Sequence, residues 1–218
     1  MKRLYVLAEG QTEETFVREL LVPHYARLGL FITPIVVITS AGHKGGLVSY
    51  GKVKPQIARL CRQDRTACVS TMFDLYALPS DFPGKDSADY PLRQSGARQA
   101  VFLEDALSRD VNEANFIPNL MVHEFEALLF VQPERFGVWV DDIDVVDSLA
   151  KIAGQRPSPE DINDDPSTAP SKRILALMPG YEKPFHGPLI ACDIGLDAMR
   201  RTCPHFCAWL DKLEQLLC

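Results

Sequence analysis

The chain has 218 residues and a formal net charge of −6, with 46% hydrophobic and 24% charged residues. This composition is typical of a globular domain and excludes disordered, collagen-like and low-complexity chains. No window approaches the roughly 18 apolar residues of a membrane-spanning helix, and no signal peptide is visible, so we expect a cytoplasmic protein with reduced cysteines. The negative net charge also excludes a simple polycationic nucleic-acid binder. If the substrate is a polyanion, the positive charge must therefore come from a metal ion, a local basic patch or a partner.

The first 140 residues alternate between strand and helix patterns. Apolar runs bounded by turn residues predict strands at residues 3–8, 34–39, 67–76 and 116–123. Helices are expected at residues 12–28, 55–65, 97–108 and, as a short segment, 124–130. Pro23 predicts a kink in the first helix, and Pro55 suits the first turn of the second. This alternation predicts an α/β domain with a mainly parallel sheet flanked by helices, whose ligands bind at the carboxyl ends of the strands.

The last third of the chain has a different pattern. Residues 141–170 are rich in Asp, Pro, Ser and Asn, which favour loops and short turns. Helices are expected after this segment, near residues 171–178, 188–201 and 204–217. We therefore expect an α/β core over residues 1–140 and a C-terminal helical extension over residues 141–218, packed together as one compact domain.

Carboxylates follow or interrupt three of the predicted strands. Glu9 closes the first strand, Asp74 lies in the third within Thr-Met-Phe-Asp-Leu-Tyr, and Asp81 follows seven residues later. Glu124 and Glu126 end the fourth strand. Carboxylates beside apolar strands are costly unless they are paired or bind a cation, and oxygen ligands suit Mg²⁺ or Mn²⁺. These five residues are therefore the candidate ligands of a divalent metal ion.

Several of these polar positions also fit ordinary structural roles. Asp81 lies in Pro-Ser-Asp-Phe-Pro-Gly, which suits a turn. Glu13 falls in a first helical turn, where the helix dipole favours an acid. Asp74 is harder to explain in this way, because it interrupts a strand with apolar flanks. His123 could orient a ligand carboxylate or contact a phosphate, and it equally suits a hydrogen-bonded core residue.

Basic residues gather in two stretches that could contact a nucleic acid. Between Ser40 and Arg65, six basic residues accompany the single acid Asp64, so the local charge is +5. Lys44-Gly45-Gly46 is a flexible loop whose N–H groups and ammonium could meet a phosphate, although the full phosphate-loop pattern is missing. The candidate nucleic-acid contacts are Lys44, Lys52, Lys54, Lys172, Arg173 and Lys183. The alternatives are a solvated helix face and pairing with the acidic segment.

A zinc site is one alternative use of the C-terminal cysteines. Cys203, His205 and Cys207 lie close together, with Cys192 and His186 nearby. No Cys-x-x-Cys pair accompanies them, although strong zinc signatures need such a pair or a comparable one. Small buried thiols fit this apolar, helical stretch better.

Several short blocks together resemble the bacterial domain-of-unknown-function family 4276. They include Glu-Gly-Gln-Thr-Glu, Met-Phe-Asp-Leu-Tyr, His-Glu-Phe-Glu-Ala-Leu-Leu-Phe, Lys44-Gly45-Gly46, Pro159-Glu160-Asp161-Ile162-Asn163, Pro170-Ser171-Lys172-Arg173 and Cys203-Pro204-His205-Phe206. The resemblance runs from about residue 5 to the C-terminus. It implies a Toprim-like fold, as in topoisomerases, primases and overcoming-lysogenization-defect nucleases. It also implies, by analogy, a partner ATPase of the ABC/AAA type encoded nearby in an antiviral defence system.

The resemblance assigns roles to three of the acids. Glu9 matches the Toprim glutamate, an acid/base or metal ligand, and Glu13 matches the second glutamate of the Glu-Gly-x-x-Glu nuclease variant. Asp74 matches the first aspartate of the Asp-x-Asp motif, whose second place is Tyr76 here. The missing carboxylate would come from Asp81 or Glu126. A topoisomerase-like nucleophile at Tyr76 is an alternative, although a strand tyrosine more often packs.

Two function classes follow from these residues and the resemblance. The first is Mg²⁺- or Mn²⁺-dependent phosphodiester hydrolysis of a nucleic acid, with DNA favoured over RNA and with Glu9, Glu13 and Lys44 as catalytic residues. The second is a non-catalytic Toprim-like subunit that binds nucleic acid or a partner, and the sequence allows a homo-oligomer for either. The segment Asp141–Asp165 has eight acids and two bases, which accounts for the net charge, and we expect it to face away from the site or meet a partner.

Overall fold

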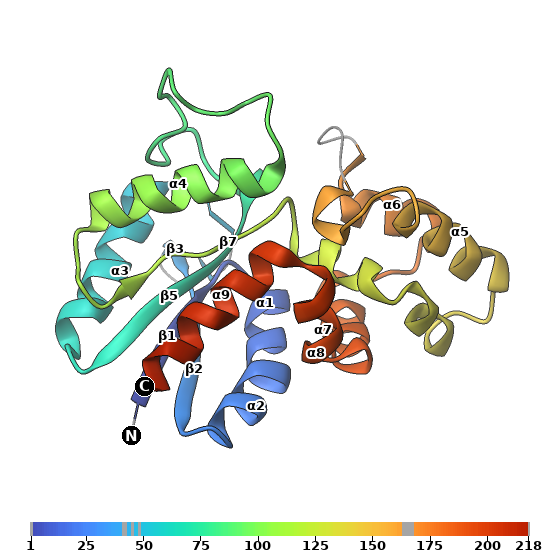
Figure 1. Cartoon of the computed structure of the whole chain (residues 1–218), viewed down its shortest axis with the longest axis horizontal. Helices are drawn as coiled ribbons and strands as arrows, with labels where there is room; N and C mark the ends of the chain where they lie inside the picture. Colours follow the sequence, from blue (N-terminus) through green and yellow to red (C-terminus); the bar gives the residue numbers. More distant parts are fainter. Residues whose placement is uncertain (1, 41–42, 45, 48, 163–167, 218) are drawn as a thin grey trace.

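A parallel β-sheet forms the centre of the computed structural model, which describes residues 2–40, 43–44, 46–47, 49–162 and 168–217 (Figure 1). Its strand order is β2-β1-β5-β6, and β7 also pairs with β5; all of these pairings are parallel. The strands are β1 (Lys2–Ala8), β2 (Leu30–Val36), β5 (Ala67–Asp74), β6 (Phe116–Ile117) and β7 (Leu120–Met121). A small antiparallel ladder joins β3 (Ile38–Ser40) to β4 (His43–Lys44). The predicted α/β class with a mainly parallel sheet is confirmed.

Helices cover both faces of the sheet. Because successive side chains of a strand point to opposite faces, the strands contribute apolar residues to a buried cluster on each side. Leu4 and Val6 of β1 belong to one buried apolar cluster and Leu7 to another. The first cluster packs against α1 (Gln11–Phe16), a π-helical segment (Val17–Leu21), α2 (Val22–Ala26) and α9 (Pro204–Glu214). The second packs against α3 (Tyr50–Gln63) and α4 (Gly96–Val111).

Prolines account for several differences from the predicted boundaries. The helix predicted at residues 12–28 is divided into α1, the π-helical segment and α2, with Pro23 in the first turn of α2. The strand predicted at residues 116–123 is split into β6 and β7 around Pro118, which has no N–H to donate. α3 begins at Tyr50, so Pro55 lies inside the helix and not in its first turn.

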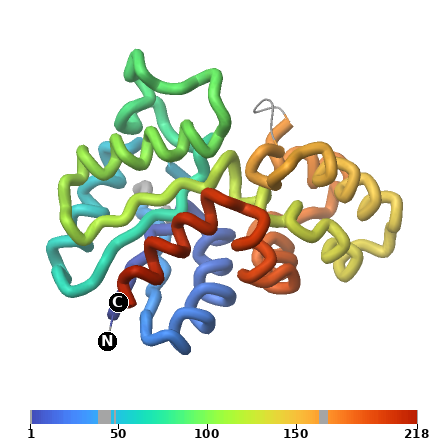
Figure 2. Tube along the Cα trace, in the orientation of Figure 1, coloured from blue at the N-terminus to red at the C-terminus, as the bar shows by residue number. Residues whose placement is uncertain are grey.

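The segment predicted as loops contains a helix, so that prediction was wrong. α5 runs over Ile143–Ala153, and the side chain of Asp142 caps it by accepting from the Asp144 N–H at 3.0 Å. The later helices are α6 (Pro170–Leu177), α7 (Lys183–Ile194), α8 (Leu196–Thr202) and α9. The helix predicted at residues 188–201 is interrupted by Gly195, whose φ of 81° ends α7. α5 and α6 pack against each other at the end of the molecule opposite to α3 and α4 (Figure 2).

The C-terminal helices share their core with the strands. A single buried cluster includes Leu4 of β1, Leu149 of α5, Ile174 of α6 and Trp209 of α9.

In the described part of the chain, no helix is long and apolar enough to cross a membrane. The five cysteines described there are free thiols.

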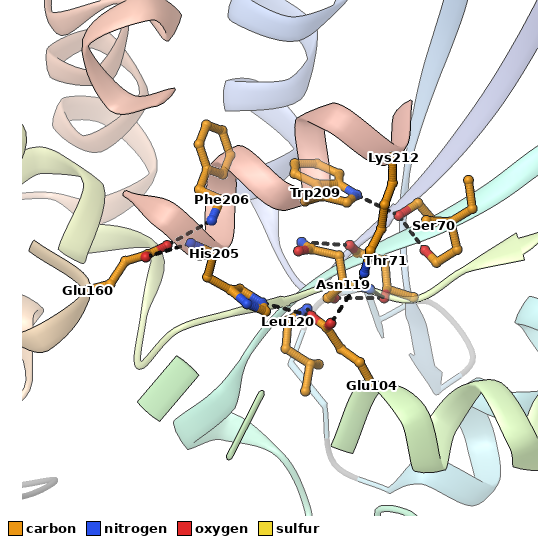
Figure 3. A network of polar contacts seen from close by, with 11 residues as sticks. Ser70, Thr71, Glu104, Asn119, Leu120, Glu160, His205, Phe206, Trp209 and Lys212 are labelled. Carbon is orange, nitrogen blue, oxygen red and sulfur yellow. Dashed lines mark hydrogen bonds and ion pairs between the residues drawn. The ribbon is translucent and has the colours of Figure 1, made fainter. Parts of the chain in front are cut away.

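A buried polar network fastens α9 to the sheet and to α4 (Figure 3). Glu104 of α4 accepts from the Leu120 N–H at 2.8 Å and lies 2.9 Å from Nε2 of His205. Glu160, from the acidic segment, accepts from the first N–H groups of α9, at His205 and Phe206 (both 2.9 Å). Glu160 of the acidic segment therefore turns inward and serves as a helix cap of α9, a role that the sequence analysis did not assign to it.

Candidate functional site

The carboxyl ends of β1 and β5 bring Glu9 and Asp74 together. The Glu9 N–H donates to the Met72 carbonyl at 3.1 Å, which extends the pairing of these two strands by one residue. One side-chain oxygen of Glu9 accepts from the Asp74 N–H at 3.1 Å. Because the two strands are parallel neighbours, their final residues meet at the same edge of the sheet, as the sequence predicted.

Asp74 connects this edge to the segment after β7. Its Oδ1 accepts from the Phe125 N–H at 2.9 Å, at the start of a 3₁₀ helix over Phe125–Val131. Glu124 and Glu126 flank Phe125, and Glu126 is only 2% exposed. A chain of hydrogen bonds thus runs from Glu9 through Asp74 to the loop that carries the other two acids.

Glu13 joins the cluster from the first turn of α1. Its Oε2 accepts from the Gly10 N–H at 2.8 Å, and its side chain is buried. Gly10 suits this turn, because a Cβ there would lie 3.3 Å from Glu13 Oε2. Burial, together with the nearby Glu9 carboxylate, raises the pKa of Glu13 to about 7. This residue is therefore both a helix cap and a group that can exchange a proton near neutral pH.

Lys183, the first residue of α7, is the cation of the site. Its Nζ lies 3.4 Å from Oε1 of Glu126 and 4.0 Å from Oε1 of Glu124. Burial alone would lower the pKa of Lys183, but the carboxylates of Glu126 and Glu124 outweigh it and hold this pKa above its ordinary value. The other oxygen of Glu124 accepts from the Ser171 N–H at 3.0 Å, so the first turn of α6 adjoins the cluster.

The remaining pKa values indicate an excess of negative charge. Burial raises the pKa of Glu9, and burial with the nearby carboxylates of Glu13, Glu9 and Glu126 raises the pKa of Asp74 far above its usual range. Burial also raises the pKa of Glu126 to about 7, although Lys183 opposes the shift. Burial is the largest cause of each shift, repulsion among the carboxylates adds to it, and raised carboxyl pKa values of this kind are common at functional sites.

The atoms that the cluster offers as ligands are of the chemical kind that a hard divalent cation prefers. They are carboxylate oxygens, among them the buried Oε1 of Glu126, which has an ion pair with Lys183 but no hydrogen-bond partner among the described residues. The Tyr181 hydroxyl is also buried without a hydrogen-bond partner in that part of the chain. In that same part of the chain, however, no three Asp, Glu, His or Cys side chains are placed to share one metal ion. Metal binding would therefore require the carboxylates to converge, with Lys183 now providing the positive charge.

The structure does not bring Asp81 into this cluster. Its carboxylate caps α3, accepting from the Tyr50 N–H at 2.9 Å and from the Ser49 hydroxyl at 2.7 Å. These hydrogen bonds lower the pKa of Asp81. The carboxylate is satisfied as a helix cap, which was the structural alternative for this residue. The metal assignment of Asp81 is thus corrected.

The predicted basic contacts are dispersed. Lys183 belongs to the site, and Lys172 and Arg173 lie in the first turn of α6, next to Ser171. Arg173 donates to the Thr168 carbonyl at 2.7 Å. Lys52 and Lys54 lie on α3, where Lys54 pairs with Asp110 of α4 at 2.9 Å. The backbone of Lys44 lies in β4, but its side chain falls outside the described structure.

Tyr181 and Gly187 are parts of the site that the sequence patterns did not reveal. A Cβ on Gly187 would lie 3.0 Å from the Tyr181 hydroxyl and 3.4 Å from Thr12, so α7 packs closely against α1. The Glu126 carboxylate and burial both raise the pKa of Tyr181, with burial the larger cause. Neither residue lies at a strand end, and no local motif marks them.

The family model described as "Domain of unknown function (DUF4276)" matches residues 8–214. The chain belongs to the DUF4276 family. The match covers every residue of the acidic cluster, so the cluster is part of the DUF4276 domain itself, and the predicted family resemblance is confirmed. A search of curated proteins found no match.

One solved structure is similar to this DUF4276 chain. It is the C-terminal region of the Xanthomonas campestris pv. campestris OLD protein, with 14% sequence identity and a TM-score of 0.35. The similarity covers 97% of each chain.

The buried carboxyls predict an unusual pH dependence of stability for the metal-free protein. Because the pKa of Glu126 rises from 4.5 to about 7 on folding, the folded state holds more protons between these values. The free energy of unfolding should therefore fall as pH rises from about 4.5 to 7, by roughly 3 kcal/mol for one such carboxyl. Urea titrations in EDTA at pH 5 and pH 8 measure this, and Glu126→Gln should remove much of the slope. A free energy of unfolding that stays constant or rises between pH 5 and pH 8 would contradict the burial of the Glu126 carboxyl.

Proposed function

We propose that this protein hydrolyses phosphodiester bonds in a nucleic acid with the help of Mg²⁺ or Mn²⁺, in the manner of Toprim-type nucleases. One observation carries the proposal: carboxylates that follow β1, β5 and β7 gather in one buried to half-buried, negatively charged cluster. Carboxylates gathered in this way are costly without a cation, and the oxygen donors match these metals.

Each residue of the cluster has a role in this proposal. Glu9 and Asp74 would hold the metal together with Glu124 or Glu126, after a shift of side chains. When bound, a divalent ion polarises a phosphate oxygen and lowers the pKa of a water molecule. Glu13, whose pKa is about 7, would take up or release the proton, because an acid or base works best near the operating pH.

Lys183 would move from the carboxylates to the substrate. It has a long, partly exposed side chain, 39% accessible, and it begins α7 beside the first turn of α6. Lys172 and Arg173 lie in that turn, so a polyanion at the cluster would meet a local group of cations. Lys44 remains the proposed contact from the β3–β4 ladder. Local attraction of this kind is compatible with a net charge of −6.

The proposal extends to partners on the strength of the family resemblance. We infer a cytoplasmic effector subunit that works with an ABC/AAA-type ATPase encoded nearby in an antiviral defence system. DNA is the favoured substrate, and a homo-oligomer would be compatible with the fold. Whether an ATPase gene lies next to the gene of this protein is the simplest observation that tests this inference.

Plasmid nicking tests the enzymatic proposal directly. The purified protein, alone or together with an ATPase found to be encoded beside it, should nick supercoiled DNA in Mg²⁺ or Mn²⁺ and not in EDTA. Calorimetry should show binding of the metal alone, with a rise in thermal stability, because a ligand that binds only the folded state stabilises it. The absence of both cleavage and metal binding under these conditions would overturn the proposal.

The second candidate function is a non-catalytic subunit that binds nucleic acid or a partner. The position of Lys183 between Glu124 and Glu126 favours it, because an ammonium can act as a permanent counter-ion in place of a metal. Tyr76 at the second acidic place of the motif favours it as well. This alternative predicts that Mg²⁺ does not bind the wild-type protein but that Lys183→Gln creates a measurable affinity for it.

A further inference from the structure

A polar cavity of about 400 Å³ opens at the N-terminus of α4. Its volume lies in the range of small-molecule sites, about 300–1,000 Å³. The residues that matter for its chemistry are Tyr76, Arg93, Ser95, His123, Arg156 and Asp161. None of them belongs to the carboxylate cluster, so the cavity needs a separate explanation.

The first turn of α4 forms one wall of the cavity. This helix has 16 residues, and Ser95 is its N-cap. The first N–H groups of a helix have no intrahelical partner and carry partial positive charge, which suits an anion. A Cβ on Gly96 would lie only 2.5 Å from Cε1 of His123. The helix backbone therefore lies directly against the imidazole ring.

His123, which lines the cavity, is a second and independent feature of this place. Its side chain is only 6% exposed, and its Nδ1 has no hydrogen-bond partner among the residues that the structure describes. A buried polar atom without a partner costs free energy, and such atoms need an explanation. The backbone of His123 has a φ of 66°, a left-handed conformation that is uncommon for a residue other than Gly and often accompanies function.

The remaining lining residues suit a nucleotide. Arg93 and Arg156 supply two positive charges against the single negative charge of Asp161. The Tyr76 ring lies 5.0 Å from the His123 ring, centre to centre, and offers an aromatic surface of the kind on which bases stack. Arginine beside a helix N-terminus is a frequent arrangement for phosphate.

We propose that this cavity binds the 5′-phosphate of a nucleotide, with the phosphate at the start of α4 and at Arg93 and the base beside Tyr76. The cavity adjoins the carboxylate cluster, because Tyr76 follows Asp74 by two residues and His123 directly precedes Glu124. The Tyr76 N–H donates to the His123 carbonyl at 3.2 Å, which holds these two segments together. The inference goes beyond hydrolysis, since binding here requires no metal and no cleavage.

Calorimetry in EDTA tests this site without involving catalysis. The probes are adenosine monophosphate, adenosine, and a short oligonucleotide with and without a 5′-phosphate. Binding should depend on the phosphate, and Arg93→Gln should weaken it about tenfold or more, because hydrogen bonds to charged groups are strong. A phosphorylated oligonucleotide that binds more tightly than the mononucleotide identifies a strand end as the ligand, and equal affinities identify a free nucleotide; both support the site.

Two further variants keep the test decisive. Arg98→Gln is the matched control, because Arg98 lies in the first turn of α4, five residues after Arg93, and does not line this cavity. His123→Asn removes the imidazole, while asparagine tolerates the left-handed backbone, and its fold is checked by circular dichroism. Equal binding of adenosine and its monophosphate, no binding of any probe, or equal losses in Arg93→Gln and Arg98→Gln would each overturn the proposal.

Discussion

Replacing Asp74 by Asn should abolish metal-dependent cleavage and leave the fold intact. The substitution removes one carboxylate from the proposed metal site, while the Asn oxygen can still accept from the Phe125 N–H. We expect a loss of more than about a hundredfold in the nicking rate, since changes in the outer partners of metal ligands alone cost about 10- to 100-fold. The measurement is plasmid nicking in Mg²⁺ with wild type and variant at equal concentration.

Asp81→Asn is the matched control for this experiment. Both aspartates were predicted as ligands, but Asp81 caps α3, where Asn can replace it. This variant should therefore cut like wild type. Thermal unfolding in EDTA adds a second readout, because Asp74→Asn relieves repulsion among the acids and should be at least as stable as wild type above pH 7. Normal cutting by Asp74→Asn, or loss of cutting in Asp81→Asn, would refute the assigned site.

The parts of the site that follow strands were predictable from the sequence. Glu9 and Asp74 stand at the ends of apolar runs, and parallel strands bring their carboxyl ends to one edge whatever the details of the helices. Glu124 and Glu126 follow the same rule, although β7 has only two residues. For these residues, the local sequence pattern and the geometry of parallel sheets were enough to predict that they lie at the same edge of the sheet.

Residues whose partners are distant in the sequence were not predictable in the same way. Asp81 satisfies N–H groups about thirty residues earlier, and the helix start expected at Pro55 concealed the true cap position at Ser49. Lys183 reaches the acids because α7 begins five residues before the helix predicted at residue 188. Glu160 belongs to the acidic segment that accounts for the net charge, and its role as a cap of α9 was not predicted. Tertiary packing determines the partners of these side chains, and local sequence propensities do not predict them.

The network between α4, β7 and α9 supplies the second large effect, on stability. Glu104 is 3% exposed and serves both the Leu120 N–H and the ring of His205 (Figure 3). Glu104→Ala would leave both groups buried without their partner, so we expect a loss of about 3–5 kcal/mol in the free energy of unfolding. Urea unfolding followed by circular dichroism measures it. Glu113→Ala is the control, because its partner Arg62 is 65% exposed and such surface pairs contribute less than about 1 kcal/mol.

The pH dependence separates this charge pair from simple packing. Burial opposes protonation of His205, but its hydrogen bond to Glu104 raises the pKa of His205 above the ordinary value. The pair's contribution is therefore complete below the unfolded pKa of about 6.5 and is lost as pH rises through the folded value. Glu104→Gln can keep the Leu120 hydrogen bond without the charge, so this part of the pH profile should disappear in that variant. If Glu104→Ala costs no more than Glu113→Ala, or if Glu104→Gln keeps the wild-type profile, the network does not hold α9 and β7 as inferred.

β7 leads directly into His123 and Glu124, so a loosened network should also reduce metal binding at the cluster and phosphate binding in the adjoining cavity.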